Sequence, residues 1–350
     1  MRIYPTGMQL LSLGLSALFA TTTWAASKEL VILNWADYLA PELVAKFEAR
    51  YGAKITEIYY ESDEQRTQML VDNDAVGYDL ILTSGIDLGF YAKKGWLRPL
   101  DLAAIPNLKH ISPSWRNASK DADAYGVPFF WGTVGIIYRS DLVREPISRW
   151  LQLYQPTKEL QGRIGMIADG RDLVGMALKA LGYPLNSGDK TQLDAVEALL
   201  VAQQPHVRSY DYLNLNTESE ILIGEIWVSM IYSGDALMVQ EHNENLRYLV
   251  PEEGSNLWVD YFALGAKARE PALASAFLNF INQPDHAAEM AQYLYYATPN
   301  QAAEKLLPAA FLANPTIYPP AEVLERCEFY QPLEPRALRR RNAISARILR

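Results

Sequence analysis

Cysteine is almost absent from this chain: Cys327 is the only one among 350 residues. A disulfide within the chain is therefore excluded, and the fold has to be held together by a packed core. Hydrophobic residues make up 49% of the chain, which is enough to build such a core. Because one core rarely serves a chain of this length, we expect two domains.

Sequence signatures of the common enzyme classes are also missing. The chain contains no HExxH, no G-x-S-x-G, no P-loop and no G-x-G-x-x-G motif. Its only histidines are scattered, mostly in polar surroundings: His110, His206, His242 and His286. We therefore expect no enzyme, with no catalytic residue, no metal site and no cofactor. A carbohydrate-active enzyme is kept as a distant alternative, since paired carboxylates hydrolyse glycosides and aromatic rings stack on sugars.

Positive charge is in short supply as well. The chain has 32 Lys and Arg against 41 Asp and Glu, which gives a formal net charge of −9. An acidic surface of this kind disfavours nucleic acid and anionic lipid as partners. It is compatible with attraction of a cationic ligand.

The first 25 residues have the features of a secretory signal peptide. Arg2 precedes an apolar run over residues 10–20, and small residues end the segment at Ala25. The run is too short for a permanent anchor, which needs about 20 residues. We expect cleavage after Ala25, or after Ala26, and export to a bacterial periplasm, where stability without disulfides is ordinary.

Strand and helix patterns alternate in two parts of the chain. Apolar, β-branched runs predict strands at 30–35, 55–60, 78–83, 163–168 and 226–232. Between them, helical periodicity and capping residues predict helices at 41–51, from 62 onward, and at 173–181. Such alternation indicates parallel α/β sheets, so we expect two α/β lobes over roughly 27–137 and 138–260. A cleft between two such lobes is a favoured place for a ligand.

An acid stands beside an aromatic residue in the stretch NLWVDYFALG, residues 256–265. Because side chains alternate along a strand, Trp258 and Asp260 share one face. A carboxylate inside a protein needs water, a proton or a cation, and no Lys or Arg adjoins Asp260 in the sequence. The missing cation could come from a ligand.

Acidic residues recur at the ends of other predicted strands, in most cases beside an aromatic residue. They are Trp35, Asp37 and Tyr38 after the first strand, Asp169 and Asp172 after residue 168, and Tyr232 and Asp235 after residue 231. A negative pocket lined by rings suits an organic ammonium, which gains a charge-assisted hydrogen bond and roughly 0.5–2 kcal/mol over a ring face. In the alternative interpretation these acids cap helices and the rings belong to the core. An iron site is also conceivable, although tryptophan beside carboxylate suits an alkyl ammonium better.

Several stretches together make the chain similar to the periplasmic spermidine/putrescine-binding proteins of bacterial polyamine importers. They are LNWADYLAPELVAKFEARYG, YESDEQ, YDLILTS, VPFFWGTVGIIYRSD, DGRDLVGMALKALGY, LWVDYFALGAKA and YATPNQAA, and they cover nearly the whole mature chain. The resemblance implies a two-lobed, type II periplasmic binding protein fold of the α/β class, with the ligand cleft between the lobes. Lobe 1 would contain 27–137 plus 261–306, and lobe 2 would contain 138–260 plus 307–350.

The resemblance also implies a set of ligand-binding residues. Rings would enclose the methylene chain, carboxylates would bind the ammonium groups and hydroxyls would add hydrogen bonds; the residues are Trp35, Asp37, Tyr38, Ser84, Asp169, Asp172, Tyr232, Trp258, Asp260 and Tyr296. The chain departs from the pattern in having Ile86 where spermidine binders usually have tyrosine, and Tyr232 where they often have tryptophan. The family's glutamine near the end corresponds to Gln331 or is replaced by Tyr330.

The implied function is a monomeric periplasmic receptor that closes on a linear polyamine, such as spermidine, norspermidine or putrescine. It would deliver its ligand to an inner-membrane permease complex of the ABC type. In the alternative, as in norspermidine-sensing relatives, it would report to a membrane cyclic-di-GMP signalling protein. Six arginines in the stretch 335–350 predict a basic, partly amphipathic helix that either packs on the second lobe or docks a partner.

Overall fold

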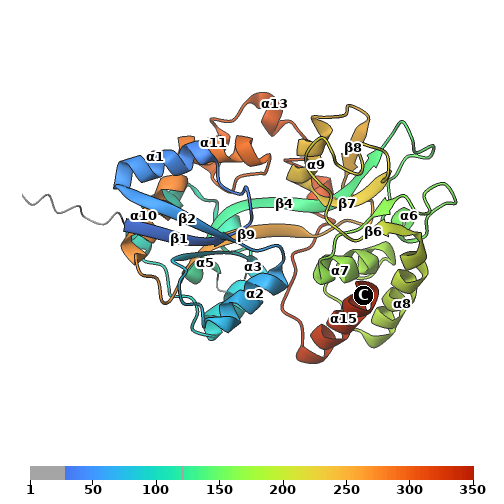
Figure 1. Cartoon of the computed structure of the whole chain (residues 1–350), viewed down its shortest axis with the longest axis horizontal. Coiled ribbons are helices and arrows are strands. Elements are labelled where there is room, and N and C mark those ends of the chain that lie inside the picture. Colours follow the sequence, from blue (N-terminus) through green and yellow to red (C-terminus); the bar gives the residue numbers. More distant parts are fainter. Residues whose placement is uncertain (1–27, 120–121) are drawn as a thin grey trace, which may run out of the picture.

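The computed structural model describes residues 28–119 and 122–350. The predicted signal peptide and its cleavage site lie outside these residues. Across the two described ranges, no helix is long and apolar enough to span a membrane. Figure 1 shows two halves side by side, with the end of the chain in the right-hand half.

The left-hand half begins with alternating strands and helices, as the sequence predicts. They are β1 (Lys28–Asn34), α1 (Pro41–Tyr51), β2 (Ala53–Tyr59), α2 (Asp63–Asp72), β3 (Leu80–Ser84) and α3 (Gly85–Lys93). Local signals set the ends of these helices. Pro41 opens α1, and Gly52 ends it in the left-handed conformation that glycine adopts without strain. The Ser62 hydroxyl caps α2 by accepting the N–H of Gln65 at 3.1 Å.

The right-hand half repeats this alternation. Its elements are α6 (Leu151–Tyr154), β5 (Ile164–Gly165), α7 (Gly170–Ala180), α8 (Lys190–Gln203), β6 (Val207–Ser209), β7 (Val228–Tyr232), α9 (Ser233–Gln240) and β8 (Leu246–Leu249). The strand predicted over 163–168 is shorter than expected and contains only Ile164 and Gly165, with a shift of register between them in the pairing with β6. The strand predicted at 226–232 corresponds to β7.

Two long strands join the halves. Strand β4 (Gly126–Arg139) pairs with β9 (Leu257–Leu264) through its first part and with β7 and β8 through its second part. At about 3.3 Å per residue, its 14 residues are long enough to serve both halves. Figure 1 shows β4 and β9 crossing the centre of the molecule. Both halves are therefore anchored to the same central ribbon.

The strand order in the sheet is β2-β1-β3-β9-β4-β7-β5-β6, with β8 beside β4. The predicted parallel pairing holds for β1 with β2 and β3, and for β5 with β6 and β7. Strand β9 is antiparallel to β3 and β4, and β4 is also antiparallel to β7 and β8. Strand β9 follows β8 in the chain after a short turn near Pro251 but pairs with β3 and β4, while β8 pairs with β4.

After β9 the chain returns to the left-hand half and then crosses again. The helices after β9 are α10 (Pro271–Ile281), α11 (Pro284–Leu294), α12 (Gln301–Glu304), α13 (Ala309–Leu312), α14 (Ala321–Leu324) and α15 (Pro335–Ile348). Two short helices, α4 (Pro113–Arg116) and α5 (Ala122–Tyr125), lie earlier in the chain, just before β4. Phe277 of α10 shares a core with Phe47 and Phe262. Ile344 of α15 shares the second core with Trp150. The chain thus passes between the halves more than once.

The predicted lobe bounds differ in part from the cores in which the residues after 306 are buried. Leu307 and Ile317 lie in cores of the left-hand half, although both fall in the 307–350 segment assigned to lobe 2. Ile344 and Ile348 lie in the core of the right-hand half. The exact division of the chain into lobes stays a prediction.

The arginine-rich end forms the predicted helix, α15, against the right-hand half. Arg340 pairs with Asp194 and Glu197 at 2.8 and 2.5 Å, and Arg347 also pairs with Glu197. Arg341 is buried and donates to the carbonyl oxygen of Leu185 at 2.6 Å. Three of the arginines therefore hold α15 to its own half.

Candidate functional site

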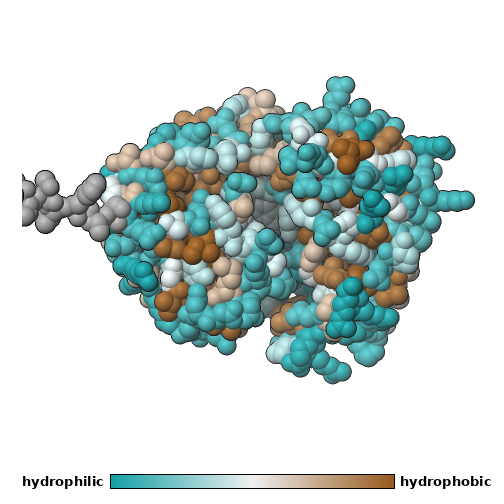
Figure 2. All heavy atoms as spheres, in the orientation of Figure 1, coloured by the Kyte–Doolittle hydropathy of each residue, from teal (hydrophilic) through white to brown (hydrophobic). Residues whose placement is uncertain are grey.

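The candidate site lies where strand ends from both halves meet. Ser84 ends β3, Tyr232 ends β7, and Asp260 lies on β9 directly opposite Ser84 in the β3–β9 pairing. Helix α7 begins at Gly170, directly after Asp169, which is its N-cap residue. Figure 2 shows that the molecular surface is hollowed between the two halves.

Three carboxylates of this site accept hydrogen bonds from tyrosine hydroxyls. Asp260 accepts the hydroxyl of Tyr38 at 3.0 Å. Asp172 accepts the hydroxyls of Tyr232 and Tyr330, one on each oxygen and each at 2.8 Å. Asp235 accepts the hydroxyl of Tyr296 at 2.8 Å on one oxygen and that of Tyr212 on the other. A phenol supplies a hydrogen bond but no charge. The negative charges of these acids are therefore not compensated by their hydroxyl partners.

Burial shifts the pKa values of these acids upward. The pKa of Asp260 is raised to about 7, first by burial and then by the nearby charge of Asp63. The pKa of Asp169 is raised to about 8 by burial and by Asp172. Burial also raises the pKa values of Asp172 and Asp235, against the lowering effect of their tyrosine hydrogen bonds. Burial thus favours either a proton or an external cation at each of these acids.

Asp169 has a structural role that the sequence left open. One of its oxygens accepts the backbone N–H groups of Arg171 and Asp172, each at 2.8 Å, so that it caps α7. Asp172 does not cap the helix; it is buried, with 3% of its surface exposed, and faces Tyr232 and Tyr330. The helix cap and the acid beside the two phenols are therefore separate residues.

Aromatic rings form the walls between these acids. The ring of Trp258 meets Tyr296 edge-on at 4.9 Å and Tyr232 edge-on at 6.2 Å, measured between ring centroids. Tyr38 lies 6.1 Å from Tyr296 in the same type of contact. A methyl group on Gly132 would lie 2.6 Å from Trp258, so glycine is needed there to seat the indole. Aromatic rings and carboxylates therefore lie side by side in this part of the molecule.

Two of the predicted residues have surroundings different from those expected. Asp37 is exposed, with a φ of 56°, and its charge acts on Glu57 and Tyr59 instead of joining the buried acids. Strand β1 ends at Asn34, so the strand alternation that would align Asp37 with Trp35 no longer applies. Trp35 itself packs against Tyr60, with 4.3 Å between ring centroids.

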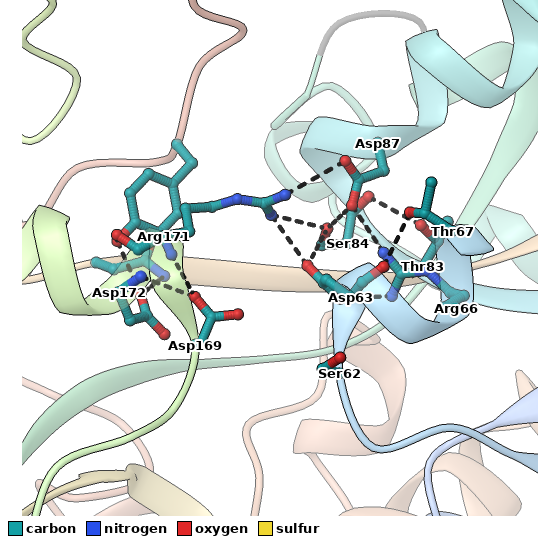
Figure 3. A network of polar contacts seen from close by, with 12 residues as sticks. Ser62, Asp63, Arg66, Thr67, Thr83, Ser84, Asp87, Asp169, Arg171 and Asp172 are labelled. Carbon is teal, nitrogen blue, oxygen red and sulfur yellow. Dashed lines mark hydrogen bonds and ion pairs between the residues drawn. The ribbon is translucent and has the colours of Figure 1, made fainter. Parts of the chain in front are cut away.

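Ser84 also has close neighbours that the sequence did not suggest. Its hydroxyl donates to Asp87 at 2.9 Å and to Asp63 at 3.3 Å. Both acids bind Arg66, and Arg171 reaches the same group from the other half, as Figure 3 shows. Asp63 and Arg66 lie in a stretch for which the sequence pattern predicts a helix but no contact with the other half.

Three further site residues were missed or left undecided. Asp235 is the acceptor for both Tyr212 and Tyr296; the sequence places it among the acids at strand ends, but the ligand-binding set implied by the resemblance does not include it. Tyr330 faces Asp172, whereas the Gln331 backbone N–H binds Asn186 at 2.8 Å. Tyr330 is therefore the residue of this pair that borders the site. Tyr212 lies in a loop without any motif in the sequence.

Several known proteins are similar to this chain in sequence or in structure. The chain is 29% identical over 321 residues to the spermidine/putrescine-binding periplasmic protein of Escherichia coli, covering 91% of this chain and 90% of the relative. It is 29% identical to the norspermidine sensor of Vibrio cholerae, covering 86% and 83%. A spermidine/putrescine ABC transporter substrate-binding protein of Streptococcus pneumoniae superposes with a TM-score of 0.78 at 30% identity, covering 92% of this chain and 98% of that one.

These similarities confirm the predicted two-lobed periplasmic binding protein fold. The sequence profile of the bacterial extracellular solute-binding proteins matches residues 42–319, which is most of the chain. Proteins of this kind bind solutes and do not convert them, in agreement with the expectation of a receptor and not an enzyme. The chain therefore belongs to the family of bacterial extracellular solute-binding proteins.

Proposed function

We propose that this protein is a periplasmic receptor for a linear polyamine. The observation that carries the proposal is the set of cleft acids whose hydrogen-bond partners are neutral: Asp169, Asp172, Asp235 and Asp260. Among the described residues, no Lys or Arg forms an ion pair with any of them within 4.0 Å. A ligand with ammonium groups would supply the positive charge that the protein does not.

The rings between the acids suit the rest of such a ligand. Methylene segments would pack against Trp258, Tyr232 and Tyr296, while each ammonium would lie beside a carboxylate. A cation also gains energy over an aromatic face, in addition to its hydrogen bond to carboxylate. Spermidine, norspermidine and putrescine share this alternation of charge and carbon chain, and all appear in the names of relatives.

Closure of the halves would present the bound ligand to a membrane partner. Ligand contacts that exist only in the closed form shift the population toward it, and the partner would recognise that form. We propose an inner-membrane ABC-type permease complex as the partner, as the Streptococcus pneumoniae relative suggests. Signalling through a membrane sensor is the second candidate, favoured by the similarity to the norspermidine sensor.

Calorimetry tests the proposal directly. We expect putrescine, spermidine or norspermidine to bind with one ligand per chain and to raise the midpoint of thermal unfolding, because binding to the folded state alone stabilises it. Glycerol and an amino acid without a second amine serve as negative controls. The absence of both heat and thermal shift with all three amines would overturn the proposal.

Affinity for the amine should rise with pH between 6 and 8. Burial raises the pKa of Asp260 to about 7 and that of Asp169 to about 8, so both hold protons at pH 6 before the amine binds. The ammonium groups stay charged over this range, as in lysine. Binding must therefore release protons, and we expect weaker binding at pH 6 than at pH 8. Titrations in buffers of different ionisation enthalpy would count these protons; pH-independent binding would contradict the expectation.

A further inference from the structure

An arginine from one half reaches into a group of acids on the other half. Arg171 lies on α7, yet its Nη1 donates to Asp63 at 3.0 Å and to Ser84 at 3.4 Å. Its Nη2 donates to Asp87 at 3.4 Å. Figure 3 shows the side chain extended from the α7 side toward these three residues. In the described part of the chain, these are the hydrogen bonds that join α7 to α2 and α3.

Asp63 and Asp87 both form ion pairs with Arg66, an arginine of their own half. Arg66 donates to Asp63 at 2.6 Å and to Asp87 at 2.7 Å, and its side chain is 1% exposed. The two carboxylates carry two negative charges and Arg66 carries one positive charge, so this group has a net charge of about −1. Arg171, with 27% of its side chain exposed, supplies the second positive charge from across the cleft. The first half alone therefore presents a group that accepts a cation.

This group is continuous with the amine site proposed above. Ser84 lies opposite Asp260 in the β3–β9 pairing, so the hydroxyl and the site acid stand on neighbouring strands. Asp63 is close enough to act electrostatically on both Asp260 and Asp169. An amine lying along the cleft acids would therefore have the guanidinium of Arg171 at this end.

The position of Arg171 is fixed by residues of the site itself. Its backbone N–H binds Asp169 at 2.8 Å, and its carbonyl oxygen accepts the hydroxyl of Tyr330 at 3.0 Å. The Tyr330 ring also lies 5.9 Å from the guanidinium carbon. The same tyrosine donates to Asp172. The arginine and the amine-facing acids are thus held by one set of contacts.

We propose that Asp63, Ser84 and Asp87 form a further ammonium subsite, which Arg171 fills with its own guanidinium, and that Arg171 thereby limits the length of the amine that the cleft accepts. This inference rests on the proposed polyamine-binding function. A short diamine ends before the guanidinium and leaves its ion pairs intact. A longer polyamine places an additional ammonium toward Arg171, where like charges repel, and must displace it to reach the acids.

The test compares ligand preference in the wild type and in Arg171→Met. Removing the guanidinium leaves Asp63 and Asp87 with Arg66 alone and frees a net negative charge for an ammonium. We expect the ratio of spermine affinity to putrescine affinity, measured by calorimetry, to rise at least tenfold. Adding Asp87→Asn to this variant removes the freed charge, so the ratio should return toward the wild-type value. Arg340→Met, which removes an arginine paired with Asp194 and Glu197 away from the cleft, should keep the wild-type ratio.

The outcomes separate this inference from the proposed function. If the Arg171→Met protein binds all amines more weakly in the same proportion, Arg171 only holds the halves together and the inference is wrong. If the ratio rises equally in the Asp87→Asn double variant, the gain does not come from the acids and the inference is also wrong. If the wild type binds no amine, the proposed function itself fails. Arg171→Gln is the second variant should the methionine variant not fold, and thermal unfolding monitors both.

Discussion

Asp260→Asn is expected to weaken polyamine binding by about ten- to hundredfold, because it removes a charged hydrogen bond of about 1.5–3 kcal/mol. Asp260 has Tyr38 as its hydrogen-bond donor, and this phenol cannot replace the lost negative charge toward an ammonium. Calorimetry with the amine that binds the wild type most tightly measures the loss. Asp285→Asn is a matched control, since Asp285 is 72% exposed on α11. Wild-type affinity in the Asp260→Asn protein would show that the site is placed wrongly.

The ligand-free fold should tolerate this change. Burial raises the pKa of Asp260 to about 7, so the folded state holds its proton more tightly than the unfolded state does. The stability that this group contributes is present below its unfolded pKa and is lost as the pH rises through 7. At pH 8 the variant therefore removes an unfavourable buried charge, and its unfolding midpoint should not fall. A large drop in the midpoint would mean that weak binding reflects misfolding.

Trp258→Ala should weaken binding by roughly tenfold or more for a different reason. The indole meets Tyr232 and Tyr296 edge-on, and its removal takes away the apolar wall against which a methylene chain would pack. Because no charge changes, the pH dependence of binding should stay as in the wild type. A changed pH profile would argue against a purely apolar role for this ring.

The central features of the site could be predicted because they depend on short-range patterns. Trp258 and Asp260 lie two residues apart on a strand, and Asp169 and Asp172 lie at the start of a helix. Strand alternation and helix capping are local properties, so the sequence shows them directly. Asp37 lies outside such a local pattern, because the strand ends at Asn34 and the chain turns through a left-handed residue.

What could not be predicted depends on contacts between distant parts of the chain. Tyr212 and Tyr296 meet at Asp235 from 23 and 61 residues away in the sequence, and Tyr330 meets Asp172 from 158 residues away. No period or motif connects such positions. Arg171 was overlooked for a similar reason, since its partners Asp63 and Asp87 lie in the other half. The antiparallel pairing of β9 with β3 and β4 likewise depends on the path of the whole chain, which local sequence patterns do not determine.

Arg66→Met is expected to destabilise the folded protein by about 3–5 kcal/mol, because removing one partner of a buried ion pair leaves its acids uncompensated. Arg66 binds Asp63 and Asp87 through its guanidinium and also donates to Tyr91 at 3.1 Å. Although burial would raise the pKa of Asp63, Arg66 and Arg171 hold it below its usual value. Urea unfolding at pH 7 measures the loss of stability.

A surface ion pair provides the control for this prediction. Arg144 is 89% exposed and lies 3.5 Å from Glu159, so Arg144→Met should change stability by less than about 1 kcal/mol. A loss in the Arg66→Met protein as small as this would show that the buried network contributes little. Because the pKa of Asp63 is lowered in the folded wild type, the stability that this acid contributes is present above its unfolded pKa and is lost only as the pH falls below that value.

The two arginines around Asp63 and Asp87 should therefore separate stability from ligand preference. Arg66 lies within the same half as both acids and is almost fully buried, so its loss acts on folding. Arg171 comes from the other half and is partly solvated, so its loss should cost little stability and act mainly on which amine binds. Equal losses of stability in Arg66→Met and Arg171→Met would contradict this separation. They would mean that both arginines stabilise the contact between the halves and that Arg66 has no special role in folding its own half.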